Sequence, residues 1–390
     1  MSKVKVFHFH NGHGGGVLAV IKNLIKFSTN KNVENHIIYT INENIHSNYI
    51  YEEIEGVVSQ QLFYYKANNS FYYTCRQLAK FLPDDTAIIV AHDWLELGMA
   101  SNLGLQNPVM QVVHGNYDYY FDLAVKHAAS VDAFICISQK IFTGLISKLP
   151  LRNKDIFCSH FPVPYVEAKK ITNNLVHIIY YAGDLKDNNK QLATVIKIAD
   201  QLNDGSGNYL FTIAGGGMAE AEFFAAWPAT MKQHVNFLGS TGNKEILALL
   251  PLQDIFLLPS RNEGLPVSVV EAMKAGVVPL VSRWDGSGIE ELIMEGTTGY
   301  YFEIGAVADY IACIKNLHHN RQLLSAMSFS CMKKATELFD PLQNTIKFEN
   351  ILIEASKKTT SKKRALKVYG SRLDHPLIPN FITSLLRDKK

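Results

Sequence analysis

Short, almost continuous apolar runs alternate with segments of helical spacing along most of this chain. Five runs precede residue 138, and five more follow residue 175. Near-continuous apolar strands separated by helices are typical of parallel sheets that are covered on both faces. The alternation therefore predicts an α/β chain with two doubly wound parallel-sheet domains. The runs are VKVFHF, HIIYTI, AIIVA, VMQVV, DAFICI, VHIIYYA, YLFTIAG, HVNFLG, DIFLLPS and VVPLVS.

The stretch PVPYVEAKKITNN, at residues 162–174, separates the two series of runs. It is polar, contains two prolines and has no period, so it is typical of a linker between domains. We predict one domain over residues 1–165 and a second over residues 166–340, followed by a closing helix at 341–356 and a basic tail at 357–390. Ligands of open parallel sheets bind beyond the carboxyl ends of strands. We therefore expect the functional residues in the loops after strands, with the two domains facing a central cleft.

Composition and charge exclude several classes of protein. No stretch of the 390 residues reaches the roughly 18 consecutive apolar residues of a membrane span. Residues 1–10 lack the apolar run of a signal peptide, so we expect a cytoplasmic protein. Residues 357–390 hold ten basic and two acidic residues, which leaves the rest of the chain mildly acidic. A nucleic-acid partner is therefore not expected.

A glycine-rich loop at residues 12–16 follows the first predicted strand, and a second at 215–217 follows the strand YLFTIA. Glycines let the backbone approach a ligand and open a helix whose N-terminus attracts anions. Neither loop fits the dinucleotide fingerprint G-x-G-x-x-G, because Val17 and Glu220 occupy its last position. The loops argue against a nicotinamide oxidoreductase, and a tight strand-to-helix turn explains them as well as a ligand site does.

The segment PSRNEGLPVSVVEAMKAG, at residues 259–276, is the most informative one. Pro266 suits the first helical position and Gly276 suits the end of a helix, so a short helix is predicted at 266–275. The free amides at the N-terminus of this helix form a ready site for a phosphate group.

Two glutamates flank this predicted anion site. Glu263 lies in the loop before the helix and Glu271 lies on its second turn, with seven residues between them. A carboxylate accepts hydrogen bonds from two hydroxyl groups, which suits the vicinal diol of a ribose or a hexose. Two solvated acids on a surface helix explain the spacing alone equally well.

With the residues that follow it, this segment resembles the signature of retaining glycosyltransferases of the GT-B fold, specifically glycosyltransferase family 4 (glycosyl transferases group 1). The family's pair of glutamates falls on Glu263 and Glu271. The resemblance covers residues 3–355 and implies two Rossmann-like domains, the first for the acceptor and the second for the nucleotide-sugar donor. The other matching segments are residues 12–16, AHDWLELG at 91–98, VVHGN at 112–116, ICISQKI at 135–141, AGDLKDNNK at 182–190 and IEELIMEGTTGYYF at 289–302.

The resemblance also implies roles for individual residues. Glu271 would hold the ribose, Glu263 the hydroxyls of the transferred sugar, and Lys190 the leaving diphosphate. His114 would contact the transferred sugar; from the sequence alone, a hydrogen-bonded histidine at a strand end is the plainer interpretation. Glu263, Lys190 and His114 are thus the catalytic candidates. The other donor-side candidates are Gly264, Leu265, Gly183, Asp184, Gly215, Gly216 and Gly239, and the acceptor-side candidates are Gly14, Gly15 and Gly16.

One position departs from the family's pattern. The family usually has Gly-Arg after the first strand of the second domain, whereas this chain has Gly183 followed by Asp184. An acid near the diphosphate weakens donor binding or the stabilisation of the leaving group. Either Lys186 compensates, or the phosphate lies elsewhere, or the enzyme is impaired.

The implied reaction is the transfer of a sugar from a UDP- or GDP-sugar to a hydroxyl acceptor, with retention of the anomeric configuration. Such a hexosyltransferase acts on a glycan or a lipid-linked acceptor, as in the synthesis of bacterial surface polysaccharides. We expect no cofactor and no metal ion, because the chain has no DxD triplet. The alternatives are a non-catalytic binding or partner subunit with this fold, which Asp184 suggests, and an epimerase with this fold.

The tail combines a basic run with an apolar stripe. The basic run is KKTTSKKRALK, at residues 357–367. Together with the stripe it fits peripheral contact with an anionic membrane at its inner face. The alternative is a stripe that packs on the protein's own core. The stripe consists of Leu377, Ile378, Phe381, Ile382, Leu385 and Leu386, which recur at helical spacing.

Overall fold

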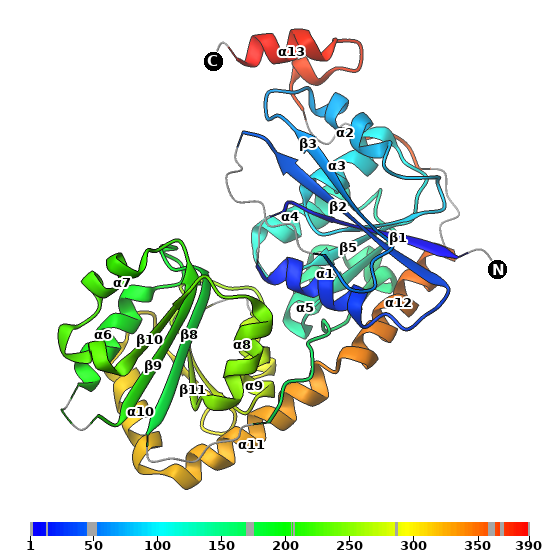
Figure 1. Cartoon of the computed structure of the whole chain (residues 1–390). Helices are drawn as coiled ribbons and strands as arrows, with labels where there is room; N and C mark the ends of the chain where they lie inside the picture. Colours follow the sequence, from blue (N-terminus) through cyan, green and yellow to red (C-terminus); the bar gives the residue numbers. More distant parts are fainter. Residues whose placement is uncertain are drawn as a thin grey trace. The chain divides into compact units, whose positions relative to one another are not determined.

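The computed structural model divides the chain into two compact units. Unit 1 comprises Met1–Pro162 and Pro341–Lys390, and unit 2 comprises Val163–Asp340. Each unit is a parallel β-sheet with helices on both of its faces (Figure 1). The structure describes residues 3–12, 15–44, 53–168, 175–203, 205, 207–284, 288–357, 363–366 and 370–388.

The sheet of unit 1 has seven strands in the order β3-β2-β1-β4-β5-β6-β7, and every neighbouring pair is parallel. The chain builds outward from β1 in one direction and then continues on the other side of β1 with β4. The strands are β1 (Val4–His10), β2 (Val33–Asn42), β3 (Ser59–Tyr65), β4 (Ile88–Ala91), β5 (Val109–Val113), β6 (Ala133–Cys136) and β7 (Ile156–Cys158).

Helices of unit 1 come from both ends of the chain. The helix α12 follows unit 2 in sequence and packs against α1, so the last part of the chain completes the first unit. The helices are α1 (Gly16–Lys26), α2 (Phe71–Ala79), α3 (Trp94–Leu103), α4 (Asp118–His127), α5 (Gln139–Lys148), η1 (Pro150–Asp155), α12 (Pro341–Lys357), η5 (Arg372–Asp374) and α13 (Asn380–Arg387).

Unit 2 repeats the same design with six parallel strands in the order β10-β9-β8-β11-β12-β13. The strands are β8 (Val176–Asp184), β9 (Tyr209–Gly216), β10 (Val235–Gly239), β11 (Ile255–Leu258), β12 (Val278–Ser282) and β13 (Tyr300–Phe302). The helices are α6 (Leu192–Leu202), α7 (Glu220–Ala226), η2 (Ala229–His234), α8 (Asn243–Leu249), η3 (Leu250–Leu252), α9 (Val267–Lys274), η4 (Ile289–Glu291), α10 (Val307–His319) and α11 (Arg321–Leu338).

The predicted fold class of two doubly wound parallel sheets is confirmed. All ten apolar runs are strands, and the helix predicted at 266–275 is α9. The strands that the runs did not include are β3, β7 and β13, which lie at edges of the sheets. Edge strands are only partly covered, so they carry fewer consecutive apolar residues: β3 reads SQQLFYY and has one buried residue, Phe63.

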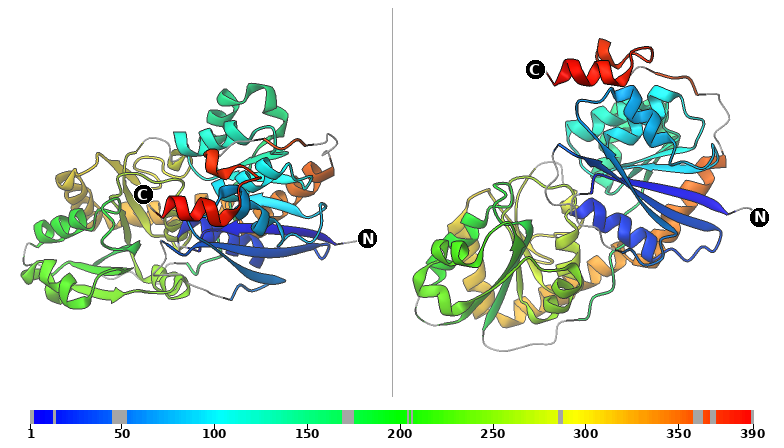
Figure 2. Two further views of the ribbon diagram at one scale, coloured as in Figure 1. Left: turned by 90° about the horizontal axis from the view of Figure 1, so that it is seen from above. Right: turned by 45° about the horizontal axis from the view of Figure 1, so that its top comes forward.

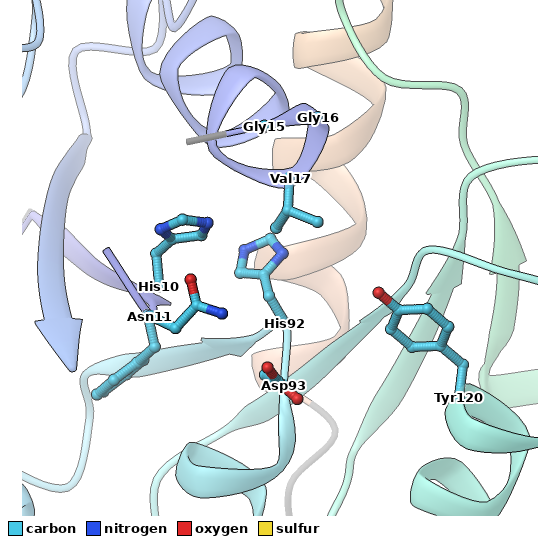
Figure 3. A pocket seen from close by; sticks show the side chains of 9 residues that line it. His10, Asn11, Gly15, Gly16, Val17, His92, Asp93 and Tyr120 are labelled. Atoms are coloured by element: carbon cyan, nitrogen blue, oxygen red, sulfur yellow. The ribbon is translucent and has the colours of Figure 1, made fainter. Parts of the chain in front are cut away.

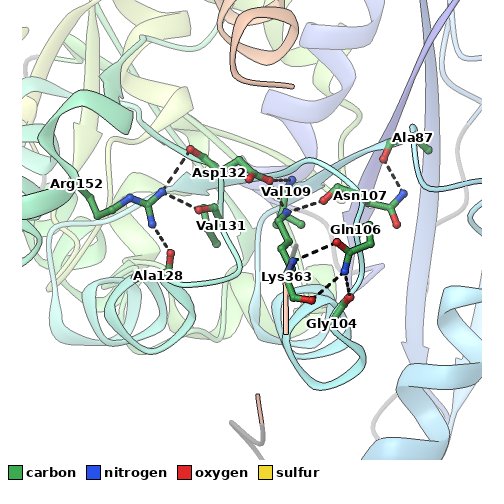
Figure 4. A network of polar contacts seen from close by, with 10 residues as sticks. All are labelled: Ala87, Gly104, Gln106, Asn107, Val109, Ala128, Val131, Asp132, Arg152 and Lys363. Carbon is green, nitrogen blue, oxygen red and sulfur yellow. Dashed lines mark hydrogen bonds and ion pairs between the residues drawn. The ribbon is translucent and has the colours of Figure 1, made fainter. Parts of the chain in front are cut away.

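The segment between α12 and α13 is bound to unit 1 through Lys363. Its ammonium donates to the Asp132 carboxylate at 2.5 Å and to the Asn107 carbonyl at 2.7 Å, while Gln106 bonds to its backbone on both sides (Figure 4). Gly104, at the end of α3, has a φ of +59°, and a Cβ there would lie 2.6 Å from the Ala365 nitrogen. Gly104 therefore permits both the end of α3 and the close approach of this segment.

In unit 2, one buried lysine joins the two segments through which the chain enters and leaves the unit. The Lys274 ammonium, at the end of α9, donates to the carbonyls of Val163 at 2.6 Å, Phe339 at 2.8 Å and Pro164 at 3.4 Å. The Val163 amide also donates to the Phe339 carbonyl at 3.3 Å. Burial lowers the pKa of Lys274 to about 8, so the ammonium is charged at neutral pH.

Candidate functional site

Each sheet has one point where neighbouring connections run in opposite directions, and this point attracts ligands in doubly wound folds. It lies between β1 and β4 in unit 1 and between β8 and β11 in unit 2. Polar side chains gather beyond the carboxyl ends of these strands in both units.

In unit 2, Lys190 and Glu263 form an ion pair between the loop after β8 and the loop after β11. The distance from Lys190 Nζ to Glu263 Oε1 is 2.5 Å, and both side chains are largely buried. The two residues are 73 positions apart in sequence, and the adjacent strands bring them together. The pair sits just before α9, whose N-terminal amides carry partial positive charge.

The two loops are also joined through their backbones. The Asn189 side chain donates to the Asn262 carbonyl at 2.7 Å and accepts from the Asn262 amide at 2.9 Å. The Arg261 amide donates to the Asn189 carbonyl at 2.9 Å. These three bonds fix the neighbours of both members of the ion pair, so the pair is held by the loops and not by the charges alone.

Gln191, directly after Lys190, has a φ of +57°, the one positive φ of a non-glycine residue in the described part of the chain. Such a backbone costs about 1–3 kcal/mol and persists where the surroundings impose it. It turns the chain sharply into α6, and Lys190 lies at that turn.

Glu271, on α9, is buried with 3% of its surface exposed. Its carboxylate accepts from Asn243 Nδ2 at 2.9 Å and from the Tyr181 hydroxyl at 3.1 Å. Burial raises the pKa of Glu271 to about 7, and the two hydrogen bonds oppose that rise. The carboxyl group is therefore poised to exchange a proton near neutral pH when its surroundings change.

Asp184, at the end of β8, faces its own loop. Its carboxylate accepts from the Lys186 amide at 2.8 Å, and a Cβ at Gly217 would lie 2.1 Å from it. Gly217 has a φ of +83°, so this contact needs glycine for two reasons. Lys186 pairs with Glu222 of α7 at 3.0 Å. To supply the positive charge that Asp184 lacks, Lys186 must therefore leave this ion pair with Glu222.

The remaining donor-side candidates lie around the same end of the unit 2 sheet. Gly183 and Asp184 end β8, and Gly215 and Gly216 end the neighbouring β9, with Asp184 in register with Gly216. Gly239 ends β10. Gly264 and Leu265 precede α9 by two or three positions, so their amides lie in the N-terminal turn region.

Unit 1 contains a pocket of about 190 Å³ beyond the carboxyl ends of β1 and β4 (Figure 3). Gly15 and Gly16 at the start of α1 line it. Gly14 lies outside the described residues. The other lining residues are Phe9, His10, Asn11, Val17, His92, Asp93 and Tyr120.

Three buried histidines form a chain of hydrogen bonds behind this pocket. His8 Nδ1 lies 3.4 Å from His92 Nε2, and His92 Nδ1 lies 2.9 Å from His114 Nε2. Burial lowers the pKa of His8 to about 4 and that of His114 to about 3, and it lowers the pKa of His92 as well. A neutral imidazole has one N–H, so the central ring, His92, donates to one of its two neighbours and accepts from the other. The tautomers of the three rings are therefore coupled.

The wall of the pocket is fixed by the start of α3. Asp93 caps the helix, and Glu96 accepts from the amides of His92 at 2.7 Å and Asp93 at 2.6 Å, which completes a capping box. Tyr119 donates a hydrogen bond to the Asp93 carboxylate. Burial raises the pKa of Glu96 to about 8. His92 and Asp93 are thus held from their backbones.

The structure brings together two predicted catalytic candidates, Lys190 and Glu263, as an ion pair, and it places Glu271 on α9, the helix that follows Glu263. His114 lies in unit 1, where its Nε2 faces His92. The sequence analysis missed several residues of these two groups, and only the Asp-x-x-Glu spacing of the capping box could have pointed to some of them. The missed residues are Tyr181, Asn189, Asn262, His8, His10, His92, Asp93 and Tyr120, whereas Asn243 ends the 239–243 stretch that the resemblance places around the base of the donor.

Comparison with known proteins connects unit 2 to sugar transfer. Residues 160–330 match the family described as Glycosyl transferases group 1. The chain is 30% identical over 117 residues to the sulfoquinovosyl transferase SQD2 of Arabidopsis thaliana, a match over 29% of this chain and 22% of that protein. It is 24% identical over 147 residues to the UDP-Gal:alpha-D-GlcNAc-diphosphoundecaprenol alpha-1,3-galactosyltransferase of Escherichia coli, over 37% of each chain. The chain thus spans less than two-fifths of the length of either relative.

Solved structures extend the likeness to both units. The crystal structure of Anabaena HepE in complex with UDP-glucose has a TM-score of 0.69 to this chain, with 15% sequence identity, and the match covers 90% of this chain and 99% of that one. At this identity the likeness concerns the fold. The chain therefore has the fold of GT-B glycosyltransferase structures, and its residues 160–330 are similar to the Glycosyl transferases group 1 family.

Proposed function

We propose that this protein transfers a sugar from a nucleotide-diphosphate sugar to a hydroxyl acceptor, with retention at the anomeric carbon. The observation that carries the proposal is the meeting of the Lys190–Glu263 pair with the N-terminus of α9, the helix that bears the buried Glu271. The printed names of a galactosyltransferase relative and of a structure with UDP-glucose support a UDP-sugar as donor.

In the proposed reaction, the bond between the anomeric carbon and the phosphate oxygen breaks while the acceptor oxygen bonds to that carbon on the same face. The acceptor proton passes to the leaving phosphate oxygen. Lys190 and the amides of Gly264 and Leu265 stabilise the negative charge on the leaving diphosphate. Glu263 orients the sugar hydroxyls, and Glu271 holds the ribose. We propose that the reaction needs no metal ion, because these groups supply the positive charge.

The acceptor binds, in this proposal, to the pocket of unit 1. Asn11, Asp93 and Tyr120 offer amide, carboxylate and hydroxyl groups that suit the hydroxyls of a sugar. The backbone at Gly15 and Gly16 allows close approach. The name of the E. coli relative includes a lipid diphosphate acceptor, which supports a lipid-linked acceptor here.

The test is a screen of UDP- and GDP-sugars for donor hydrolysis, with mass detection of the released nucleotide. We expect one sugar to release its nucleotide with the wild type and far less with Lys190→Ala. Hydrolysis at the same rate by both proteins would exclude the proposed site. An epimeric nucleotide sugar as product would indicate an epimerase instead.

A second candidate function is a non-catalytic partner subunit with a nucleotide-binding fold. Asp184 favours it, because its carboxylate stands where the family has arginine, while Lys186 is paired with Glu222. A thermal shift with UDP, GDP and NAD separates the candidates. Stabilisation by UDP or GDP without nucleotide release from any sugar would favour the subunit, and stabilisation by NAD alone would exclude both candidates.

A further inference from the structure

The helix α13 is amphipathic in the reverse of the usual sense. In most surface helices the apolar side faces the protein and the polar side faces water. Of the six side chains of the predicted stripe, Ile378 is half-buried. The other five are exposed, and we call these five the α13 stripe. They are Leu377 (84% exposed), Phe381 (71%), Leu385 (58%), Leu386 (46%) and Ile382 (37%). Packing of this stripe on the protein's own core, the alternative in the sequence analysis, is therefore wrong.

The polar side of α13 binds unit 1 through several hydrogen bonds. Asn380 accepts from the Ser70 amide at 2.7 Å and donates to Asn69 at 3.1 Å. Arg387 pairs with the buried Asp374 at 2.8 Å, and Asp374 also accepts from the Phe71 amide at 2.6 Å. These bonds fix the orientation of the helix, so the α13 stripe faces outward because its opposite side is bound. In Figures 1 and 2, α13 lies at the edge of unit 1 beside α2.

From these contacts we infer that the α13 stripe binds the surface of an anionic lipid bilayer, with α13 lying in the interface. Four exposed apolar side chains on one side of a short helix, with Leu377 in the turn before it, match the way interfacial helices insert between lipid headgroups. None of the described helices is long and apolar enough to cross a bilayer. The inference goes beyond the proposed function and does not depend on it.

The positive charge of residues 357–390 favours an anionic lipid surface as the partner of the α13 stripe. Residues 357–390 hold ten basic residues and two acidic ones, Asp374 and Asp388. Two of the basic residues are paired, Lys363 with Asp132 and Arg387 with Asp374. Lys357, Arg364 and Arg372 are exposed. Anionic lipids attract such a segment. A second copy of this chain, docked stripe to stripe, would bring two strongly basic segments together and be repelled.

The small size of the α13 stripe also favours a lipid surface over a protein partner. A stable protein–protein interface buries roughly 800 Å² on each partner, with about 20 residues or more on each side. The α13 stripe offers five side chains on an eight-residue helix and the turn before it. Insertion of a few apolar side chains together with basic residues suffices for peripheral lipid binding.

The test measures flotation of the full-length protein with vesicles of phosphatidylcholine plus phosphatidylglycerol, and with vesicles of phosphatidylcholine alone. We expect salt-sensitive binding to the anionic vesicles. The double variant Phe381→Ser/Leu385→Ser should bind them at least about tenfold more weakly, because two apolar insertions are lost. The matched control is Leu151→Ser, which removes a 97% exposed leucine elsewhere in unit 1 and should bind as the wild type does. All substituted side chains are exposed, so circular dichroism should show unchanged folding.

A second readout places the stripe directly at the lipid. A tryptophan introduced by Phe381→Trp should shift its fluorescence to the blue on addition of anionic vesicles, while one introduced by Leu151→Trp should not. Absence of flotation, equal flotation with both vesicle types, or unchanged binding by the double variant would overturn the inference. Self-association of the wild type that the double variant loses, without vesicle binding, would assign the stripe to a second copy and overturn it as well.

Discussion

The two units place polar side chains at the same point of the same topology but with opposite chemistry. Beyond β1 and β4, unit 1 buries a chain of imidazoles whose pKa values are lowered. Beyond β8 and β11, unit 2 buries a carboxyl group, Glu271, whose pKa is raised, beside the ion pair of Lys190 and Glu263. The backbone therefore decides where a ligand can bind, and the side chains at that place decide which charge it meets.

The difference extends to the response of each unit to acid. The unfolded chain binds more protons than folded unit 1 at the histidines below pH 6.5, so acid destabilises unit 1 there. Folded unit 2 binds more protons than the unfolded chain at Glu271 between about pH 4.5 and 7, so acid favours its folded state in that window. Burial raises the pKa of Glu96 in unit 1 to about 8, so this carboxyl group, like Glu271, holds a proton in the folded state at neutral pH. It offsets the uptake of one proton, whereas the three histidines of the imidazole chain each take up a proton when unit 1 unfolds in acid.

The largest expected effect is acid destabilisation confined to unit 1. His8 and His114 should each remove on the order of 3 kcal/mol of stability when the pH falls from 7 to 4, given folded pKa values of about 4 and about 3. Hydrogen exchange of the full chain, corrected for the intrinsic rate at each pH, measures the loss of protection on acidification. Peptides from β1 and β4 report on unit 1, and peptides from β8 and β11 report on unit 2.

The variant His114→Asn should weaken the pH dependence of unit 1 by one proton, while His319→Asn, an exposed histidine of unit 2, should leave it unchanged. Equal loss of hydrogen-exchange protection in both units on acidification would contradict the prediction that acid destabilises unit 1 alone.

The next effect concerns the donor site. Lys190→Ala and Glu271→Ala should each lower kcat/KM for the nucleotide sugar by roughly 30- to 1,000-fold, or about 2–4 kcal/mol, because each removes a charged contact with the donor. The matched control is Lys197→Ala, which removes an exposed lysine in the middle of α6. Steady-state kinetics and a thermal melt check each variant. Near-wild-type kinetics for both site variants with an intact fold would contradict the assignment of the site.

A smaller effect is the pH dependence of nucleotide binding. A ribose diol donates to a carboxylate, so binding should deprotonate Glu271, and affinity for UDP should fall by up to about tenfold per pH unit below pH 7. Calorimetry in buffers of different ionisation enthalpy measures the released proton. Glu271→Gln should bind UDP more weakly and without this pH dependence; an equal slope in the variant would place the titrating group elsewhere.

The smallest effect is expected at Asp184. Its carboxylate is already satisfied by the Lys186 amide and lies against Gly217, so Asp184→Arg should change UDP-sugar affinity by only a few-fold, in the direction of tighter binding. Loss of turnover in this variant would give Asp184 a role of its own in the reaction. Unchanged affinity would mean that the residue does not face the diphosphate.

Much of the fold follows from local pattern. Inner strands such as AIIVA and DIFLL are apolar on both faces because helices cover both faces, and this leaves a signal in the sequence. The edge strand SQQLFYY has no such signal, because only its pairing with β2 defines it. The helix α13 was visible as a stripe, but its orientation depends also on bonds of Asn380 to Ser70 and of Arg387 to Asn69, partners more than 300 residues away in sequence.

The candidate site was predictable only in part. Glu263 and Glu271 lie on one short segment with a helix start between them, so their spacing carries information. The histidine chain does not: its members lie on or after β1, β4 and β5, and only the order of the strands makes them neighbours. In the sequence, Tyr181 looks like an ordinary aromatic residue of a core strand. Only the fold shows that its hydroxyl donates to Glu271 of α9, which also accepts from Asn243 of α8.

The three carbonyl contacts of Lys274 have a mechanical consequence. The chain enters unit 2 at Val163 and leaves it at Asp340, and one ammonium holds both backbones at the end of the helix that carries Glu271. Pro162 and Pro341 stiffen the chain just outside these points. A displacement of either backbone at this point is therefore shared with the other and reaches the end of α9, three residues from the proposed ribose-binding carboxylate of Glu271.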